Sequence, residues 1–275
     1  LSGGHGWMFR QCLGFAQGEI GRCARLTSPF GEFGDSRRQI HRMATLGRNT
    51  YGVGMAKNLV VIGAGPGLGA AIANRFAHAG FSIGLIARDD AMLTELSDEL
   101  TADGTTCFVA RADVTDADEL REALDSLDAL LGTPDVVLSN TSMFVEATPT
   151  VVRPDVFETV WRVACLSSLI ALQQVVPAMR ERGTGVFLMP GTPLALKPWP
   201  PGAALGAAKA AARNFVMNAG AELAPDGIHA AVVTIDGVIK DGTEFSPAKI
   251  AEHFFTVSEL AADKWQQEYV YSGNA

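Results

Sequence analysis

Asn58-Leu-Val-Val-Ile-Gly-Ala-Gly-Pro-Gly-Leu-Gly-Ala-Ala-Ile-Ala-Asn74 is an apolar run that breaks at a glycine cluster and continues into small residues that favour a helix. The pattern predicts a strand, a tight turn and a helix. The glycines of the turn allow backbone conformations that a Cβ forbids, and they let a phosphate approach peptide N–H groups. These glycines are Gly63, Gly65, Gly67 and Gly69.

Two interpretations of this turn are open. Close packing of a strand against a helix also selects glycine, so a glycine pattern alone is weak evidence of a ligand. The context favours a binding site, because the turn follows the apolar residues 59–62 and a second strand-like run, Phe81 to Ala87, comes after one helix length. Together these segments make a βαβ unit, the arrangement that holds the pyrophosphate of a dinucleotide.

Composition indicates one α/β domain that binds a small molecule. The chain has 275 residues, 48% of them hydrophobic, which suffices for one large core. The net charge of −8 disfavours nucleic acid or an anionic membrane as partner, because both select for basic surfaces. No apolar run approaches the roughly 20 residues that cross a bilayer. The cysteines at 12, 23, 107 and 165 lack metal-ligand or redox spacing, so we expect no metal and a soluble, cytoplasmic protein.

Residues 1–54 differ from the rest of the chain. They hold seven arginines, no lysine and three acidic residues, so this segment is basic although the whole chain is acidic. They also hold eleven glycines and no strand-like run. Three interpretations are open: a disordered leader, an Arg-rich transit peptide, or an extension upstream of a natural start at Met55. The third is preferred, with the folded domain over 55–275.

From Met55 onward, strand-like and helix-like segments alternate. Strands are expected at 59–62, 81–87, 105–111, 135–139, 185–189, 228–235 and 267–271, and helices at 70–79, 90–100, 116–131, 154–182, 203–223 and 247–260. Repeated βα units predict a doubly wound parallel sheet of the Rossmann type, in a single domain with helices on both faces. Ligands of such sheets bind at the carboxyl ends of the strands.

The order of motifs resembles the short-chain dehydrogenase/reductase family over residues 55–271. The glycine turn matches the family's cofactor turn, and Asp113-Val114 resembles the pair that contacts the adenine ring. Ser139-Asn-Thr-Ser142 stands where the family has Asn-Asn-Ala-Gly, and only Asn140 is retained. Asp236-Gly237 replaces a Pro-Gly pair in the loop that borders the nicotinamide. The resemblance implies cofactor contacts from Gly63, Gly65, Gly67, Leu68, Gly69, Asp113, Val114, Asn140, Lys209, Gly237 and Ile239.

The family's catalytic signature is incomplete in this chain. The family has a tyrosine four residues before a lysine, and the phenol transfers a proton to the substrate oxygen. Here Lys209 is preceded at that spacing by Leu205, and no tyrosine lies between Tyr51 and Tyr269. The chain thus resembles an atypical member of the family that lacks the catalytic tyrosine.

Two further catalytic positions of the family are also changed. The family's serine, which hydrogen-bonds the substrate, is replaced by Thr192, and its supporting asparagine aligns with Ala164. The resemblance therefore implies catalytic roles for Thr192 and Lys209 alone.

Each of these polar residues also has a simpler interpretation. Lys209 could be an ordinary exposed lysine on an alanine-rich helix, and Thr192 a turn hydroxyl in Gly-Thr-Pro. Asp113 could cap the helix that begins near 116. These alternatives remain open from the sequence.

Arg88 favours NADP over NAD. It follows the second strand, where an acid would bind the ribose 2′-OH and an arginine would pair with a 2′-phosphate. Ala87 stands where the acidic residue usually lies, so no carboxylate is present at that position. Asp89 and Asp90 are close enough to repel a phosphate or to serve NAD instead.

The expected function is an NAD(P)-dependent oxidoreductase that acts on a small carbonyl or alcohol through a degenerate active site. The alternative is a non-catalytic NADP(H)-binding sensor on the same fold, which Leu205 and Ala164 favour. A third option recruits Asp236 beside the nicotinamide for another reaction. The apolar helices at 154–182 and 203–223 are expected to pair in a homodimer or homotetramer.

Overall fold

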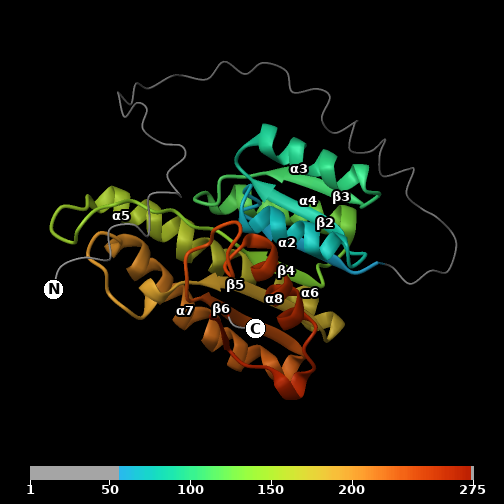
Figure 1. Ribbon diagram of the computed structural model, residues 1–275. Helices are drawn as coiled ribbons and strands as arrows, with labels where there is room; N and C mark the ends of the chain where they lie inside the picture. The colour runs from blue at the N-terminus through green and yellow to red at the C-terminus, as the bar shows by residue number, and fades with distance from the viewer. Residues whose placement is uncertain (1–55, 274–275) are drawn as a thin grey trace, which may run out of the picture. The chain divides into compact units, whose positions relative to one another are not determined.

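The computed structural model describes residues 56–273, and at its centre lies a sheet of seven parallel strands (Figure 1). The strands are β1 Asn58–Ile62, β2 Ser82–Ala87, β3 Cys107–Arg111, β4 Val136–Ser139, β5 Gly185–Gly191, β6 Ile228–Ile235 and β7 Glu268–Tyr271. Their order across the sheet is β3-β2-β1-β4-β5-β6-β7. The doubly wound parallel sheet predicted from the alternating segments is confirmed.

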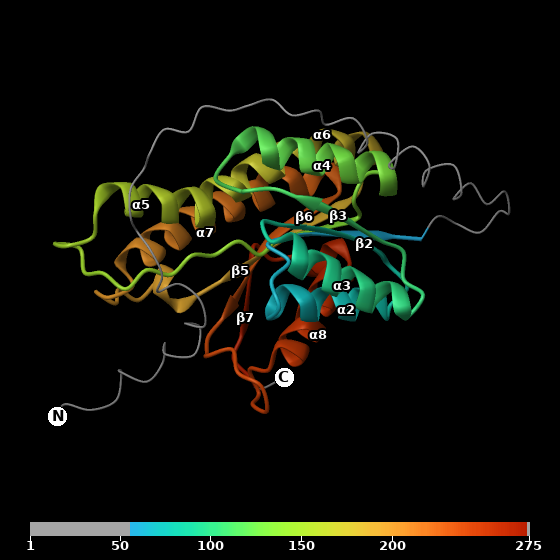
Figure 2. The same cartoon turned by 90° about the horizontal axis from the view of Figure 1, so that it is seen from above.

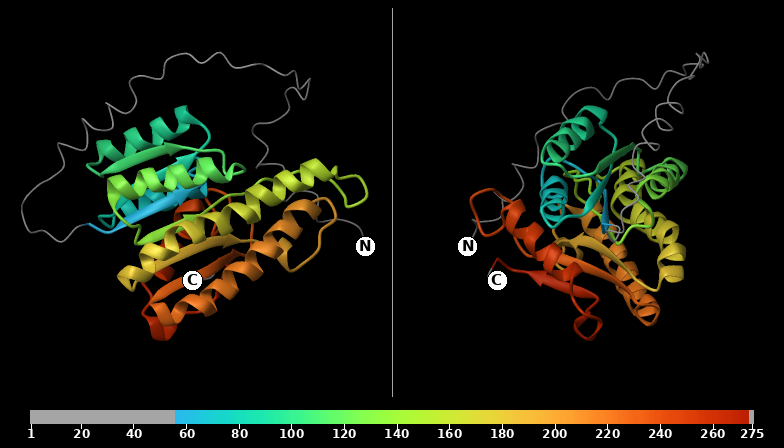
Figure 3. Two further views of the ribbon diagram at one scale, coloured as in Figure 1. Left: turned by 180° about the vertical axis from the view of Figure 1, so that it is seen from behind. Right: turned by 90° about the vertical axis from the view of Figure 1, so that its right-hand side faces the viewer.

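Helices cover both faces of this sheet. They are α2 Leu68–Ala77, α3 Asp90–Ala102, α4 Ala117–Leu131, α5 Pro154–Trp161, α6 Ser167–Arg182, α7 Ala203–Leu223 and α8 Pro247–Ser258. Helices α2, α3 and α8 pack on one face, and α4, α6 and α7 pack on the other (Figures 2 and 3). The fold is therefore a Rossmann-type arrangement of three layers.

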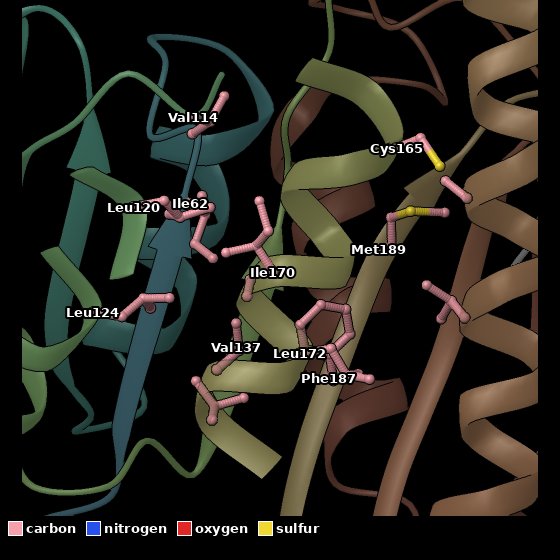
Figure 4. Close-up of a cluster of buried hydrophobic side chains, with 14 of the residues drawn as sticks. Ile62, Val114, Leu120, Leu124, Val137, Cys165, Ile170, Leu172, Phe187 and Met189 are labelled. Carbon is pink, nitrogen blue, oxygen red and sulfur yellow. The ribbon is translucent and has the colours of Figure 1, made fainter. Parts of the chain in front are cut away.

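Strand β1 explains why the first apolar run has no polar alternation. Leu59 and Val61 contribute to the core on the α2 side, whereas Val60 and Ile62 contribute to the core on the α4 side. Figure 4 shows Ile62 on the α4 side, close to Leu120 of α4. Because both faces of a parallel sheet are covered, such a strand is apolar throughout.

The strand order reverses beside β1, and this reversal locates the site. The chain runs from β1 outward to β2 and β3, then returns to β4 on the opposite side of β1. Ile62 and Ser139, the last residues of β1 and β4, are register partners. Gly63 and Asn140 follow them directly, so they lie at the switch point where such sheets bind ligands.

The helix expected over 154–182 is not a continuous α-helix. A π-helical turn, Arg162–Leu166, separates α5 from α6. A π turn places one extra residue in the helix, and no feature of the local sequence indicated it. By length and composition alone this helical run could cross a membrane, contrary to the expectation from the sequence, but 61% of its most apolar window is buried inside the protein.

Element boundaries differ by small shifts from those expected. Strand β5 continues through Pro190 and Gly191, and β3 begins at Cys107 instead of 105. Helix α2 begins at Leu68, inside the glycine cluster, instead of at 70. The proposed leader, 1–54, lies outside the described residues.

Candidate functional site

Two glycines of the turn after β1 are explained by internal packing. A Cβ on Gly63 would lie 2.9 Å from the Asn140 carbonyl oxygen, and the φ of Gly63 is +84°. A Cβ on Gly69 would lie 2.7 Å from the Gly63 carbonyl oxygen. For these two positions the packing interpretation of the motif is correct.

The other two glycines have no such explanation. A Cβ on Gly65 or Gly67 would have no atom within 4 Å, and neither residue has a positive φ. The space above them is open at the start of α2, where the first N–H groups of a helix have no intrahelical acceptor. No side chain caps this helix. A dinucleotide pyrophosphate fits this turn, because a phosphate accepts from such N–H groups and Cβ atoms would obstruct its approach.

Asn140 holds this turn against β4. Its backbone N–H donates to the Ile62 carbonyl at 2.8 Å, and its side-chain Nδ2 donates to the Gly63 carbonyl at 2.8 Å. The side chain is thus engaged with the turn itself. Asn140 lies at the predicted site and fixes the shape of the turn.

Lys209 is buried between the ends of β4 and β5. Its side chain is only 5% exposed, and Nζ donates to the Thr141 carbonyl at 3.1 Å and to the Pro190 carbonyl at 3.2 Å. The interpretation of Lys209 as an ordinary exposed lysine is therefore wrong. Burial lowers the pKa of Lys209 to about 8. An ammonium has three protons, so one remains to donate to a ligand.

Leu205 and Ala164, which the sequence resemblance assigns to the family's tyrosine and asparagine positions, are buried and apolar. Leu205 lies one helical turn before Lys209 on α7 and is 7% exposed. Ala164 is fully buried in the π-helical turn. Neither side chain can donate or accept a proton.

Cys165, the neighbour of Ala164, also lies near Lys209, although no sequence pattern indicated it as a site residue. Burial raises the pKa of the Cys165 thiol, and the charge of Lys209 opposes this shift, so the two groups lie within electrostatic range. Figure 4 shows Cys165 near Met189 of β5. A π turn changes which side chains face the sheet, and the sequence carried no signal for that change.

Two buried hydroxyl pairs join the end of β4 to the start of α6. Thr141 Oγ1 lies 2.8 Å from Ser167 Oγ, and Ser139 Oγ lies 2.8 Å from Ser168 Oγ. Thr141 also supplies the carbonyl that accepts from Lys209. These pairs were missed as well, although a Ser-Ser doublet in an apolar helix is a signal for buried hydrogen bonds.

Thr192 begins the 3₁₀ turn Pro193–Ala195. It is half-buried, and its Oγ1 accepts from the Leu194 N–H at 3.4 Å. This hydrogen bond agrees with the interpretation of Thr192 as a turn hydroxyl. A contact between Thr192 and a substrate stays a prediction. In the same loop, Trp199 stacks on Phe144 with ring centroids 6.1 Å apart.

The acidic residues between β3 and α4, where adenine contact is predicted, have structural partners. Asp116, not Asp113, caps α4, by accepting from the N–H groups of Asp118 and Glu119. Asp113 accepts from the N–H and Oγ1 of Thr115 at 2.9 and 2.8 Å. Burial raises the pKa of the Asp113 carboxyl, but the Thr115 hydrogen bonds and nearby arginine charges outweigh it, so the net shift is downward. The interpretation of Asp113 as the helix cap is wrong.

The remaining predicted residues border these positions. Leu68 and Val114 are buried, at 8% exposed each. Gly237 and Ile239 lie in the exposed loop after β6, and a Cβ on Gly237 would overlap the ring of Phe245. Among residues 56–273, no group of three or more metal-ligating side chains occurs.

The doubly wound sheet and the open turn at its switch point define a Rossmann-type protein. The chain belongs to the short-chain dehydrogenase family, whose model matches residues 57–249. It is 32% identical over 177 residues to a very-long-chain 3-oxoacyl-CoA reductase of Aspergillus clavatus, a match that covers 62% of this chain and 50% of the relative. The chain thus spans about half the length of that curated relative.

Solved structures resemble the fold over most of their length. A short-chain dehydrogenase from Rhodopseudomonas palustris is 26% identical with a TM-score of 0.72, over 78% of this chain and 97% of that chain. An NADPH-bound short-chain oxidoreductase from Pseudomonas aeruginosa PAO1, described as containing an atypical catalytic center, is 20% identical with a TM-score of 0.72, over 80% and 96% of the two chains. The latter likeness shows the fold alone.

Proposed function

We propose that this protein is an NADP(H)-dependent oxidoreductase that acts on a small carbonyl or alcohol without the family's catalytic phenol. The observation that carries the proposal is the open space over Gly65 and Gly67, because internal packing accounts for Gly63 and Gly69 but not for these two. A nicotinamide cofactor supplies hydride transfer to or from carbon. The chain's own residues bind it, orient it and handle the proton.

The proposed contacts follow the cofactor from end to end. The α2 N-terminus holds the pyrophosphate, Asp113 and Val114 border the adenine, and Gly237 and Ile239 border the nicotinamide. Lys209 donates its third proton to a ribose hydroxyl, because its other two protons are directed to carbonyls.

Proton transfer is assigned to Lys209: during reduction its third proton would pass to the ribose hydroxyl while that hydroxyl gives its own proton to the substrate oxygen, with Thr192 as a further hydroxyl near the reacting oxygen. A pKa of about 8 suits a group that gives and takes protons near neutral pH. The lysine stays mainly protonated at pH 7 and can act as an acid during reduction. A missing phenol would slow turnover by about 10²–10⁴-fold relative to an enzyme with a positioned acid.

The preference for NADP rests on Arg88. This exposed arginine forms no ion pair with any residue in 56–273, whereas its acidic neighbour Asp89 caps α3 by accepting from the Met92 N–H at 3.1 Å. Ala87 offers no carboxylate to a ribose 2′-OH. A guanidinium without a partner favours a 2′-phosphate at this position.

The second candidate is a non-catalytic NADP(H)-binding sensor. The specific observation in its favour is the burial of apolar Leu205 and Ala164 at two family positions that carry catalytic groups. The two candidates share the cofactor site and differ in turnover.

The experiment that separates them is a titration of the full chain with NADPH followed by a turnover assay. Enhancement of NADPH fluorescence, followed by NADPH oxidation with a panel that includes a 3-oxoacyl thioester, supports the oxidoreductase. Binding without oxidation of NADPH by any carbonyl supports the sensor. Absence of NADPH binding contradicts both candidates. Lys209→Met is the matched variant, and it should abolish turnover if the lysine supplies the proton.

A further inference from the structure

The register of the sheet places Arg111 beside the position of the missing acid. Arg111 is the last residue of β3, and its register partner is Ala87, the last residue of β2. Paired residues on adjacent strands direct their side chains to the same face of the sheet. Arg111 therefore leaves the sheet on the face where a carboxylate at Ala87 would meet the adenosine ribose.

Arg111 and Arg88 act on the same region of space. The charges of both guanidiniums lower the pKa of the Asp113 carboxyl. The backbone connects the two strand ends directly, because the Ala112 N–H donates to the Ala87 carbonyl at 3.0 Å. Two arginines, one after β2 and one at the end of β3, thus lie within electrostatic range of the same carboxyl group.

The present partner of Arg111 is weakly held. Its Nε lies 3.7 Å from Asp90 Oδ2, and the two side chains are 59% and 74% exposed. Ion pairs this exposed are screened by solvent and contribute little. Arg111 is therefore available to a more highly charged anion.

We propose that Arg111 is the second guanidinium of a two-arginine site for the adenosine 2′-phosphate, and that Asp90 holds it when no phosphate is bound. The proposal rests on the cofactor site of the proposed function. A phosphate group carries about −1.5 to −2 charges and three strong acceptor oxygens, enough for two guanidiniums. One arginine alone would leave part of that charge without a partner.

The neighbouring acids do not exclude an anion here. Asp89 is engaged with the N-terminus of α3, and Asp113 with Thr115. The N-terminus of α3 adds positive partial charge to the same region. Asp90 is the acid that competes with the phosphate, so its removal should strengthen binding.

The test uses the full chain and two small probes, adenosine 2′,5′-bisphosphate and adenosine 5′-diphosphate, by isothermal titration calorimetry. Arg111→Ala should lower the affinity for the 2′-phosphorylated probe by about five- to tenfold and change the affinity for adenosine 5′-diphosphate by less than about twofold. Asp90→Asn should raise the affinity for the 2′-phosphorylated probe by about two- to fivefold. The matched control is Arg121→Ala, an exposed arginine that pairs with Asp118 at 3.0 Å on α4.

The outcomes separate this inference from the proposed function. If Arg111→Ala and Arg121→Ala both leave the 2′-phosphorylated probe unaffected, Arg111 has no role and the cofactor site still stands. If the wild-type chain binds neither probe, the cofactor site itself is wrong and this inference falls with it. Arg111→Lys is a milder variant that keeps the positive charge and so guards against misfolding. It should lose less affinity for the 2′-phosphorylated probe than Arg111→Ala does. If Arg111→Lys caused no loss of affinity, the proposal would be contradicted.

Discussion

Leu205 and Lys209 lie one turn apart on α7, and both side chains are buried at the carboxyl end of the sheet, 7% and 5% exposed. Residues four apart share a helix face. The side chain that precedes the lysine is therefore an aliphatic group next to a buried cation. In the proposed function, Lys209 is therefore the titratable group of this pair.

Leu205→Tyr should create or raise reductase activity. A phenol at this position would lie near the Lys209 ammonium, which lowers a phenol's pKa from about 10 toward neutral pH. We expect NADPH oxidation with simple carbonyls to rise by at least about tenfold, and at most by the roughly 10²–10⁴-fold that a positioned acid supplies. The rate of NADPH oxidation measures the effect.

The control variants for this change are Leu205→Phe and the double variant Leu205→Tyr with Lys209→Ala. Phenylalanine adds bulk without a hydroxyl and should not raise the rate. The gain should vanish in the double variant. No gain in the single variant with NADPH binding intact would show that substrate does not reach Leu205, and would favour the sensor.

Gly65→Val and Gly69→Ala should separate binding from folding. A side chain on Gly65 meets no protein atom, so thermal stability should stay within about 2 °C while NADPH affinity falls by about tenfold or more. A Cβ on Gly69 meets backbone, so Gly69→Ala should lower the free energy of unfolding by about 1–3 kcal/mol. Equal effects of the two substitutions on stability would contradict the inference that the space over Gly65 is open to a ligand.

Arg88→Ala should weaken NADPH selectively. In the proposed site the guanidinium would contact the 2′-phosphate, so the dissociation constant for NADPH should rise by about fivefold or more while that for NADH changes little. Fluorescence titration of both cofactors provides the measurement. An equal loss for NADH and NADPH would mean that Arg88 serves packing and not cofactor choice.

Acidification below about pH 6.5 should destabilise the fold through buried His229 and half-buried His253. His229 Nδ1 and His253 Nε2 are buried and have no hydrogen-bond partner among the described residues. Burial lowers the pKa of both rings, although the Gln266 carbonyl partly opposes the shift at His229. The unfolded chain takes up these protons first, near pH 6.5, so stability is complete above that pH and falls as the pH drops toward the lower folded pKa values.

The measurement is the melting temperature between pH 8 and 5. A loss of ~1 kcal/mol corresponds to about 2–4 °C for a domain of this size. His229→Gln should reduce the slope, whereas His78→Gln, which changes an exposed histidine, should not. Identical slopes in the wild type and in His229→Gln would count against the role of His229.

We expect a homodimer or homotetramer that assembles through the helical run α5–α6 and through α7. Phe157 and Trp161 on α5 are 37% and 36% exposed, and apolar side chains of this size are typical of subunit contacts. Trp161→Glu should shift the mass measured by light scattering at micromolar concentration toward the monomer. Val109→Glu, on the edge strand β3, is the control and should leave the mass unchanged. A wild-type chain that is monomeric under these conditions would contradict the expectation.

The sequence by itself determined the order of elements and the place of the site. The signals were local: the glycine turn after 59–62, the alternation of apolar runs, and Asn140 at the end of the fourth predicted strand. Local patterns of this kind can be recognised without knowledge of contacts between distant segments. They predicted the parallel sheet, which is confirmed, and two of the residues that they indicated, Gly63 and Asn140, lie at its switch point.

Tertiary structure decided which of these residues is available to a ligand. Gly65 and Gly69 are equivalent in the sequence, but Gly69 packs on Gly63 and Gly65 faces open space. The π turn brings Cys165 into range of Lys209, and the strand register brings Arg111 beside Ala87. Burial, register and helix phase depend on contacts between segments far apart in the chain, so no local pattern contains them.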